Sequence, residues 1–161
     1  RKVLVSGNIE KLDSFSELLC FTAARRQHIK EVILPSLNMG KIVICDRFID
    51  STIVYQGMVS GIDLKKIETL HYEYCYNLYP DLTILLDIDP QIGLIRKKFS
   101  NLHEDRFEQK KIDFHNKVRN SYKELLKVYK HRFVSVDANL DKLRIFKKIK
   151  NKINNFFENS S

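Results

Sequence analysis

The 161-residue sequence is poor in glycine and proline and has no long apolar run. Five glycines and three prolines exclude a collagen-like chain and argue against a loop-rich one. Because no run of about 18 apolar residues occurs, the sequence predicts no membrane span. The apolar stretch that ends at Val5 is too short for a signal peptide.

Cysteine is also scarce, and its pattern argues against disulfides. The three cysteines are odd in number and lie far apart in apolar surroundings: Cys20, Cys45 and Cys75. This pattern favours buried, reduced thiols in a cytoplasmic protein over disulfides or a metal site.

The sequence does have a surplus of basic residues. Lys and Arg number 28 against 20 Asp and Glu, which gives a formal net charge of +8. Such a surplus predicts an anionic partner, and nucleic acid, a membrane surface and a phosphorylated small molecule all remain open. The hydrophobic share of 43% and the charged share of 30% predict a soluble globular chain, and the length suits one domain over residues 1–161.

Short apolar segments alternate with helical patterns, which predicts an α/β fold with a parallel sheet between layers of helices. Strands are expected over residues 41–45, 82–88 and 132–136. Helices are expected over residues 14–40, 51–58, 63–78, 90–99, 108–129 and 140–157.

Several residues are expected to begin or end these helices. Ser14 followed by Glu17 has the pattern of a capping box, which places a helix start at Ser14. Pro35 strains the last turn of that helix, and Gly40 ends it. Two glycines and an aspartate are expected to break or cap the next two helices: Gly57, Gly61 and Asp63.

Ligands of parallel sheets bind at the carboxyl ends of the strands, which directs attention to residues 46–47, 87–89 and 137–139. Asp46 follows an apolar strand, as does the carboxylate that helps to hold Mg²⁺ in a Walker B strand. A carboxylate that only caps the following turn is the other interpretation. The adjacent Arg47 is well placed to bind a phosphate in a bidentate manner.

Phe21 and Arg25 are four residues apart and therefore share one helix face. An aromatic ring can stack on a base while the guanidinium bonds the edge of that base. A core phenylalanine beside a surface arginine is the alternative interpretation.

Three segments, in this order and with these separations, resemble bacterial thymidylate kinase: residues 21–25 (FTAAR), 43–48 (VICDRF) and 51–57 (STIVYQG). Weaker similarity to a later strand, the end of the lid and the adenine-side loop follows at residues 80–87, 105–108 and 136–138. The resemblance covers nearly all of residues 14–150. It implies a P-loop kinase fold with a lid loop at about residues 97–107.

The resemblance implies an enzyme that phosphorylates dTMP to dTDP with ATP and Mg²⁺. Phe21 would stack on thymine, and Arg25 would bond the pyrimidine edge. Arg47 would hold the dTMP phosphate, and Asp46 would organise Mg²⁺ and Arg47. The nucleoside pocket would be lined by Ser51, Thr52, Tyr55 and Gln56, of which the last three fit one helical face.

The resemblance assigns the ATP side to the later part of the chain. Arg96, Lys98 and Arg106 would flank the lid or lie in it, with Lys98 and Arg106 as catalytic cations. Asp137, Ala138 and Asn139 would border adenine. Many relatives carry several lid arginines where this chain has lysines, Ser100 and His103, so Lys98 is the expected lid cation and His103 an ordinary loop residue.

The sequence departs from the family in one large respect, because the pattern GxxxxGK[ST] does not occur in it. We therefore expect that these 161 residues lack the N-terminal P-loop region of their parent and have little or no kinase activity alone. The family commonly forms dimers, and the helix that starts at Ser14 is a candidate surface for a homodimer.

Three other interpretations remain open. Another nucleoside monophosphate or deoxynucleoside kinase would share the Asp-Arg pair, although Phe21, Arg25 and Gln56 together favour thymine. A basic nucleic-acid-binding module would explain the charge, but no RRM, KH, zinc-finger or helix-turn-helix signature supports it, and no nucleic-acid partner is expected. The third is a non-catalytic fragment that folds only with a partner or in an oligomer.

Overall fold

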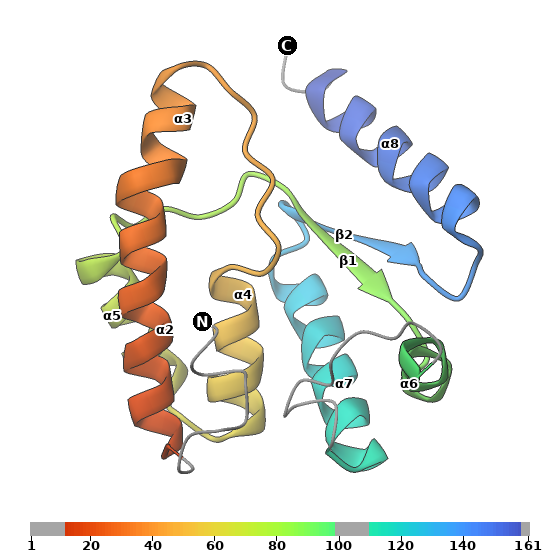
Figure 1. Cartoon of the computed structure of the whole chain (residues 1–161), viewed down its shortest axis with the longest axis horizontal. Helices are drawn as coiled ribbons and strands as arrows, with labels where there is room; N and C mark the ends of the chain where they lie inside the picture. The colour runs from red at the N-terminus through yellow and green to blue at the C-terminus, as the bar shows by residue number, and fades with distance from the viewer. Residues whose placement is uncertain (1–11, 99–109, 159–161) are drawn as a thin grey trace. The chain divides into compact units, whose positions relative to one another are not determined.

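A computed structural model of the chain describes residues 12–98 and 110–158, which divide into two compact units. Residues 12–79 belong to the first unit, and residues 80–98 and 110–158 belong to the second (Figure 1). The described part of the first unit is helical, whereas the described strands lie in the second.

Helix α2 (Ser14–His28) begins with a different cap from the one predicted. The Asp13 carboxylate accepts hydrogen bonds from the backbone N–H groups of Phe15 and Ser16, at 2.9 and 3.0 Å. The predicted capping box of Ser14 and Glu17 is therefore wrong, because Asp13 already satisfies the orphan N–H groups of the first turn. The side chain of Glu17 is buried and binds Gln56 instead.

The helix continues beyond α2 through a π-helical segment, η1 (Ile29–Ile33), and α3 (Leu34–Asn38). Pro35 lacks an N–H group, and its ring would clash with the carbonyl four residues earlier in a regular α-helix. The wider π turn just before Pro35 relieves this conflict. Gly40, with φ +70°, follows the last turn, so the predicted end of the helix is confirmed.

The next segment, residues 41–48, does not form the predicted strand over 41–45. Its apolar side chains are largely in solvent, with Ile42 73% and Ile44 90% exposed. A strand needs a neighbour that receives its backbone hydrogen bonds. Within the described residues no strand pairs with this segment, and the prediction is wrong for that reason.

Three helical segments follow: α4 (Ile49–Thr52), the π-helical η2 (Ile53–Val59) and α5 (Leu64–Tyr74). Gly57 lies inside η2 and does not break it, contrary to the prediction. A Cβ atom at Gly57 would lie 2.5 Å from Cδ2 of Leu64, so a larger residue here would require the Leu64 side chain to shift. Gly61, with φ +84°, does end the segment. Asp63 caps α5 as predicted, accepting from the backbone N–H of Lys65 at 3.0 Å.

The core of the first unit joins α2, η1, α4, η2 and α5. The side chains exposed by no more than 1% are Leu18, Ile29, Ile49, Val54, Ile67, His71 and Cys75. Burial of this apolar surface holds together the helices that carry the candidate site. Helix α5 ends at Tyr74, short of the predicted residue 78, because Tyr76 and Asn77 adopt positive φ angles of 58° and 49°.

The cysteines differ in burial, so the prediction of three buried thiols holds only for Cys75. Cys45 is half-buried, and Cys20 is exposed. Cys20 follows the buried Leu18 by two residues, and that spacing turns it away from the buried stripe of α2.

The described part of the second unit contains two parallel strands, β1 (Thr83–Asp87) and β2 (Phe133–Asp137). Their register pairs Thr83 with Phe133 and Asp87 with Asp137, so both carboxylates end the sheet at the same edge. The strands predicted over residues 82–88 and 132–136 are confirmed with small shifts of their ends.

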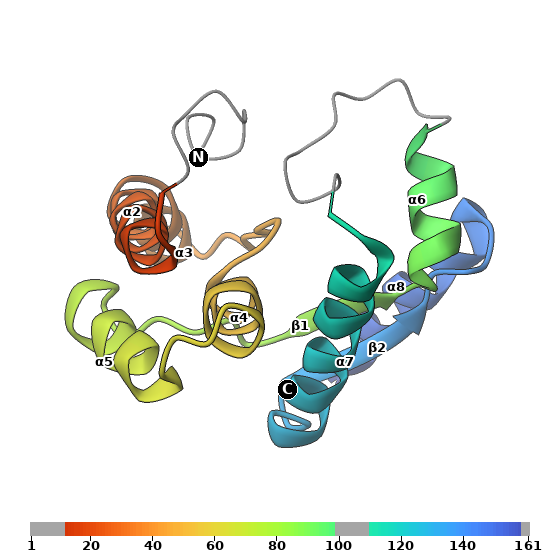
Figure 2. The same cartoon turned by 90° about the horizontal axis from the view of Figure 1, so that it is seen from below.

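Three helices accompany these strands: α6 (Pro90–Lys98), α7 (Ile112–Val128) and α8 (Lys142–Glu158). Helix α7 lies on one side of the strand pair and α8 on the other (Figures 1 and 2). The unit therefore has the helix–sheet–helix layers of the predicted α/β fold. Among the described helices, none combines the length and the apolar character that a membrane crossing requires.

Candidate active site

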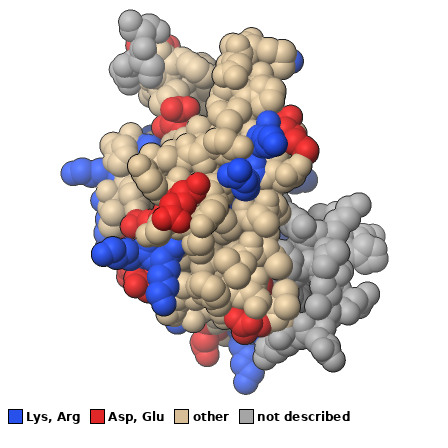
Figure 3. All heavy atoms as spheres, turned by 90° about the vertical axis from the view of Figure 1, so that its left-hand side faces the viewer, with Lys and Arg blue, Asp and Glu red and all other residues tan. Residues whose placement is uncertain are grey.

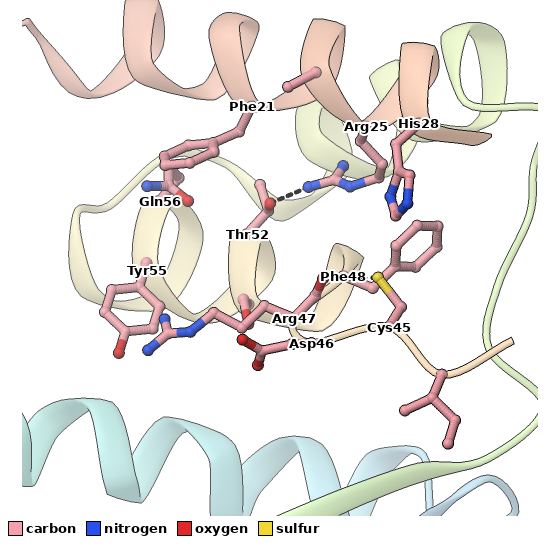
Figure 4. A pocket seen from close by; sticks show the side chains of 13 residues that line it. Phe21, Arg25, His28, Cys45, Asp46, Arg47, Phe48, Thr52, Tyr55 and Gln56 are labelled. Atoms are coloured by element: carbon pink, nitrogen blue, oxygen red, sulfur yellow. Dashed lines mark hydrogen bonds between the residues drawn. The ribbon is translucent and has the colours of Figure 1, made fainter. Parts of the chain in front are cut away.

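The first unit contains a pocket of about 420 Å³, bounded by α2, residues 44–48, α4 and η2 (Figure 4). A volume of this size suits a small-molecule ligand. The pocket brings together every residue that the sequence assigned to the nucleoside monophosphate: Phe21, Arg25, Asp46, Arg47, Ser51, Thr52, Tyr55 and Gln56.

Arg25 is the most buried cation of the pocket, with 9% of its surface exposed. Its Nη2 donates a hydrogen bond to Oγ1 of Thr52, and its Cζ lies 5.7 Å from the centre of the Phe48 ring. Burial lowers the pKa of the Arg25 guanidinium, while the neighbouring Cys75 and Asp50 oppose this change. A guanidinium titrates so far above neutral pH that Arg25 remains a cation. The helix thus presents a fixed, donor-only group to the pocket.

Phe21 lies one turn before Arg25 on α2, and both its ring and the side chain of Gln56 line the pocket (Figure 4). Gln56 comes from η2 and is 3% exposed. Its Nε2 donates to Oε2 of Glu17 at 3.0 Å. A flat apolar surface and an oriented amide therefore stand beside the Arg25 cation.

Asp46 and Arg47 lie at the more exposed side of the pocket. Arg47 has a φ of 65°, an uncommon conformation for a residue other than glycine that is often found at functional sites. Its Cζ lies 5.1 Å from the centre of the Tyr55 ring. The backbone carbonyl of Arg47 accepts a hydrogen bond from Sγ of Cys45 at 3.3 Å.

These groups divide the pocket into two chemically different ends. Arg25, Gln56 and Phe21 offer donors, an amide and a flat ring, which suits a planar heterocycle. Arg47 is a guanidinium at a more exposed position, which suits a phosphate that remains partly hydrated. The two ends together fit a nucleoside monophosphate.

In the second unit, the residues expected to border adenine lie beside Arg96. Its Nη1 donates to the carbonyl of Ala138 at 2.6 Å, and its Nη2 donates to the carbonyl of Asn139 at 2.7 Å. Asp137 caps the same turn by accepting from the backbone N–H of Asn139, and that bond is the main cause that lowers the pKa of Asp137. Arg96 therefore holds the loop after β2 through its backbone.

The carboxylates at the end of β1 are engaged in ion pairs. Asp87 accepts from Nε of Arg119 at 2.6 Å and lies 3.5 Å from Nζ of Lys123, and Asp89 lies 3.4 Å from Arg119. The bond from Arg119 holds the pKa of Asp87 below its usual value. These strand-end carboxylates thus tie β1 to α7.

Comparisons with known proteins agree with the chemistry of the pocket. The sequence model of the thymidylate kinase family matches residues 1–149. The chain belongs to this family. Thymidylate kinase of Pelobacter propionicus is 42% identical over 143 residues, and that of Trichodesmium erythraeum is 46% identical over 151 residues.

A solved structure supports the same relationship at the level of the fold. A crystal structure of thymidylate kinase from Ehrlichia chaffeensis superposes with a TM-score of 0.66 at 36% identity, which confirms the predicted fold class. The alignments cover 86% of this chain for the Pelobacter propionicus relative, 92% for the Trichodesmium erythraeum relative and 89% for the Ehrlichia chaffeensis structure. They cover 65%, 66% and 66% of the relatives' own lengths, so the chain spans just under two thirds of each.

The pocket of this thymidylate kinase family member also contains residues to which the sequence analysis gave no role in the site: Ala24, His28, Ile44, Cys45 and Phe48. Helical spacing could have found His28, because it lies three residues after Arg25 and seven after Phe21. No local pattern in the sequence marks Glu17 as part of the site, because its partner, Gln56, lies 39 positions later in the chain.

Two predicted site residues on the ATP side fall outside what the structure describes. The side chain of Lys98 and the whole of Arg106 lie outside the described residues, as do His103 and most of the expected lid. The catalytic roles assigned to Lys98 and Arg106 stay predictions.

Proposed function

We propose that the pocket of the first unit binds dTMP and that the whole protein transfers the γ-phosphoryl group of ATP to it, forming dTDP and ADP. Membership of the thymidylate kinase family supports this reaction. The observation that carries the proposal is the buried Arg25, fixed on Thr52 with Phe21 and Gln56 beside it.

The base would occupy the end of the pocket near α2. Phe21 offers its ring for stacking on thymine, and Arg25 can donate to a carbonyl oxygen at the pyrimidine edge. Ser51, Thr52 and Tyr55 line the remaining space around the nucleoside. Thr52 also has a positioning role, because its hydroxyl accepts from Arg25.

The phosphate would lie near Arg47, whose guanidinium can bind two oxygens at once. Asp46 fits a magnesium ion, since Mg²⁺ is commonly bound by one or two carboxylates together with substrate phosphates. The Asp46 side chain is exposed at the pocket, and its oxygens are the hard donors that this ion prefers. When bound, Mg²⁺ would neutralise charge on the transferring phosphoryl group.

The reaction requires little proton chemistry from the protein. A phosphate oxygen of dTMP is already ionised near neutral pH, attacks the γ-phosphorus of ATP, and the bond to the β–γ bridging oxygen breaks as ADP leaves. No side chain of the pocket needs to act as a strong general base. Arg25 and Phe21 would orient the nucleotide, and Arg47 would hold its phosphate in line.

The second unit would supply the ATP side. Asp137, Ala138 and Asn139 would border adenine through their backbone, in a loop that Arg96 holds by hydrogen bonds to its carbonyls. Lys98 and Arg106 would neutralise charge from the lid as it closes, and closure would exclude water from the γ-phosphate.

We also propose that the protein is a cytoplasmic homodimer that uses the outer face of α2. Phe15 and Leu19 are one turn apart on this face and are exposed, as is Val32 in η1. On the side of the molecule that carries α2, uncharged atoms form a broad tract between separate acidic and basic groups (Figure 3). The exposed apolar side chains of Phe15, Leu19 and Val32 favour association with a second copy.

Calorimetric titration of the 161-residue chain with dTMP, dUMP, dCMP and AMP tests the substrate. We expect dTMP to bind most tightly and AMP to bind weakly, because Arg25 can donate to a carbonyl oxygen of thymine, whereas adenine has no carbonyl oxygen. A preference for the purine nucleotide contradicts the proposal. Steeply salt-dependent DNA binding without dTMP binding would favour a nucleic-acid-binding module instead.

A further inference from the structure

Glu17 and Gln56 form a buried polar pair behind the candidate base site. Glu17 is 8% exposed and Gln56 is 3% exposed, and Nε2 of Gln56 donates to Oε2 of Glu17 at 3.0 Å. Glu17 lies on α2 one turn before Phe21, so one helix carries both the stacking ring and the partner of the amide. Gln56 therefore lines the pocket, and Glu17 supports it from behind, outside the lining residues.

The chemistry of this pair removes the usual ambiguity of an amide group. The oxygen and nitrogen of a glutamine side chain can exchange places by rotation, and the hydrogen-bond partners decide which arrangement is stable. An ionised carboxylate only accepts hydrogen bonds, so Glu17 requires the nitrogen of Gln56 to face it. In Figure 4 the amide nitrogen lies on the side away from Thr52, and the oxygen lies on the side nearer to Thr52 and Arg25.

We propose that Glu17 is a positioning residue that locks the Gln56 amide with its oxygen toward the base, and that this orientation selects a pyrimidine with an N3–H group. The inference rests on the proposed binding of dTMP in this pocket. Glu17 does not touch the nucleotide. It acts through Gln56.

Arg25 and the locked Gln56 together form a complementary pattern for one class of base. Arg25 can only donate, and the inward oxygen of Gln56 can only accept. Thymine and uracil offer a carbonyl oxygen and an N3–H group at this edge, so both bonds form. Cytosine offers an amino group and an unprotonated ring nitrogen, so it meets a donor with a donor and an acceptor with an acceptor. Sites that hydrogen-bond a substrate edge reject such a mismatch strongly.

The variant Glu17→Gln tests this role, because an amide at position 17 can either donate or accept and no longer dictates the orientation of Gln56. We expect the ratio of dTMP to dCMP affinity to fall about tenfold or more. The matched control is Glu31→Gln, which changes a carboxylate that also accepts from a glutamine, Gln27, but on the exposed surface. This control should leave the ratio within twofold of the wild type.

Exchanging the pair, with Glu17→Gln and Gln56→Glu together, provides a rescue that a purely structural role does not predict. Position 56 then carries a carboxylate that can only accept, so the preference for N3–H should return relative to Glu17→Gln alone. Melting temperatures of all variants identify any loss of folding. If Glu17→Gln is unfolded, the dTMP-to-dCMP ratio of the exchanged pair is compared with that of the wild type, and the two should agree.

The outcomes separate the two proposals. Absence of dTMP binding in the wild type contradicts the proposed function itself. Tight dTMP binding with an unchanged ratio in Glu17→Gln contradicts only the role of Glu17, as does failure of the exchanged pair to restore the ratio. A wild type that binds dCMP as tightly as dTMP also overturns the inference, without the use of any variant.

Discussion

Arg25 in the first unit and Arg119 in the second are both held by hydrogen bonds, but their partners differ in charge. Arg25 donates to the neutral hydroxyl of Thr52, whereas Arg119 donates to the carboxylate of Asp87. A hydroxyl orients a guanidinium but leaves its positive charge uncompensated. A carboxylate orients the guanidinium and also neutralises its charge. The first arrangement leaves a cation available to an anionic or polar ligand, and the second mainly joins α7 to β1.

The pKa shifts agree with this difference. Burial lowers the pKa of Arg25, while the hydrogen bond with Asp87 raises the pKa of Arg119. A group whose pKa is shifted by burial inside a pocket is a candidate functional residue, whereas a group shifted by an ion pair is more often structural. Substitutions at each arginine should therefore affect different properties.

The largest expected effect is the loss of dTMP binding in Arg25→Lys. Lysine keeps the charge but lacks the planar group that can bond Thr52 and the base together. We expect the affinity for dTMP, measured by calorimetry, to fall roughly 10- to 100-fold with little change in melting temperature.

The control for this prediction is Arg26→Lys, at the next position of α2. Arg26 is exposed, and its Nη1 donates to the carbonyl of Tyr74 at 2.7 Å. We expect Arg26→Lys to bind dTMP within twofold of the wild type. Equal weakening in the two variants would show that the burial of Arg25 has no special role.

The second expected effect is on stability, in the variant Arg119→Met. Its ion pair with Asp87 is partly buried, and its removal leaves Asp87 with only the longer contact to Lys123, at 3.5 Å. We expect the free energy of unfolding in urea to fall by about 2 kcal/mol. The control Arg144→Met breaks the exposed pair with Asp141 and should cost less than about 0.5 kcal/mol.

The third prediction is the dependence of the free energy of unfolding on acidic pH. The expected effect is smaller, since it depends on the ionisation of Asp87 alone. The pKa of Asp87 is lowered in the folded chain, with Arg119 as the main cause. A carboxyl group with a depressed folded pKa adds stability above its unfolded pKa, near 4, and that stability is lost as the pH falls through the folded value. The free energy of unfolding should therefore decline less steeply below about pH 4 in Asp87→Asn than in the wild type. If the free energy of unfolding falls equally with pH in Asp87→Asn and in the wild type, groups other than Asp87 cause the acid sensitivity.

Local geometry explains which parts of the site the sequence could predict. Phe21 and Arg25 are separated by one helical turn, and their shared face follows directly from the period of the helix. Both strands of the second unit were recognisable because apolar, β-branched residues bounded by turn signals are typical of buried strands.

The failures involve partners that lie far away in the sequence. Residues 41–45 have the apolar pattern of a strand, but a strand also requires a neighbour, and the described residues provide none. Glu17 has the spacing of a capping-box residue, yet its side chain is bound to Gln56 on another helix. Patterns of short range could not predict either result.

The cap of α2 provides the smallest of the expected effects. Asp13 satisfies two backbone N–H groups in an exposed position, and the hydroxyl of Ser16 also donates to it at 2.5 Å. We expect Asp13→Ala to lower the free energy of unfolding by about 0.5–1 kcal/mol, because these N–H groups lose their acceptor. Ser14→Ala should change stability by less than about 0.3 kcal/mol, because alanine is a better helix former and no cap is lost. The reverse order, measured by urea unfolding followed by circular dichroism, would return the cap to Ser14. That result would also contradict the contact between Glu17 and Gln56, because the carboxylate of a capping-box glutamate bonds the backbone N–H at the start of its own helix.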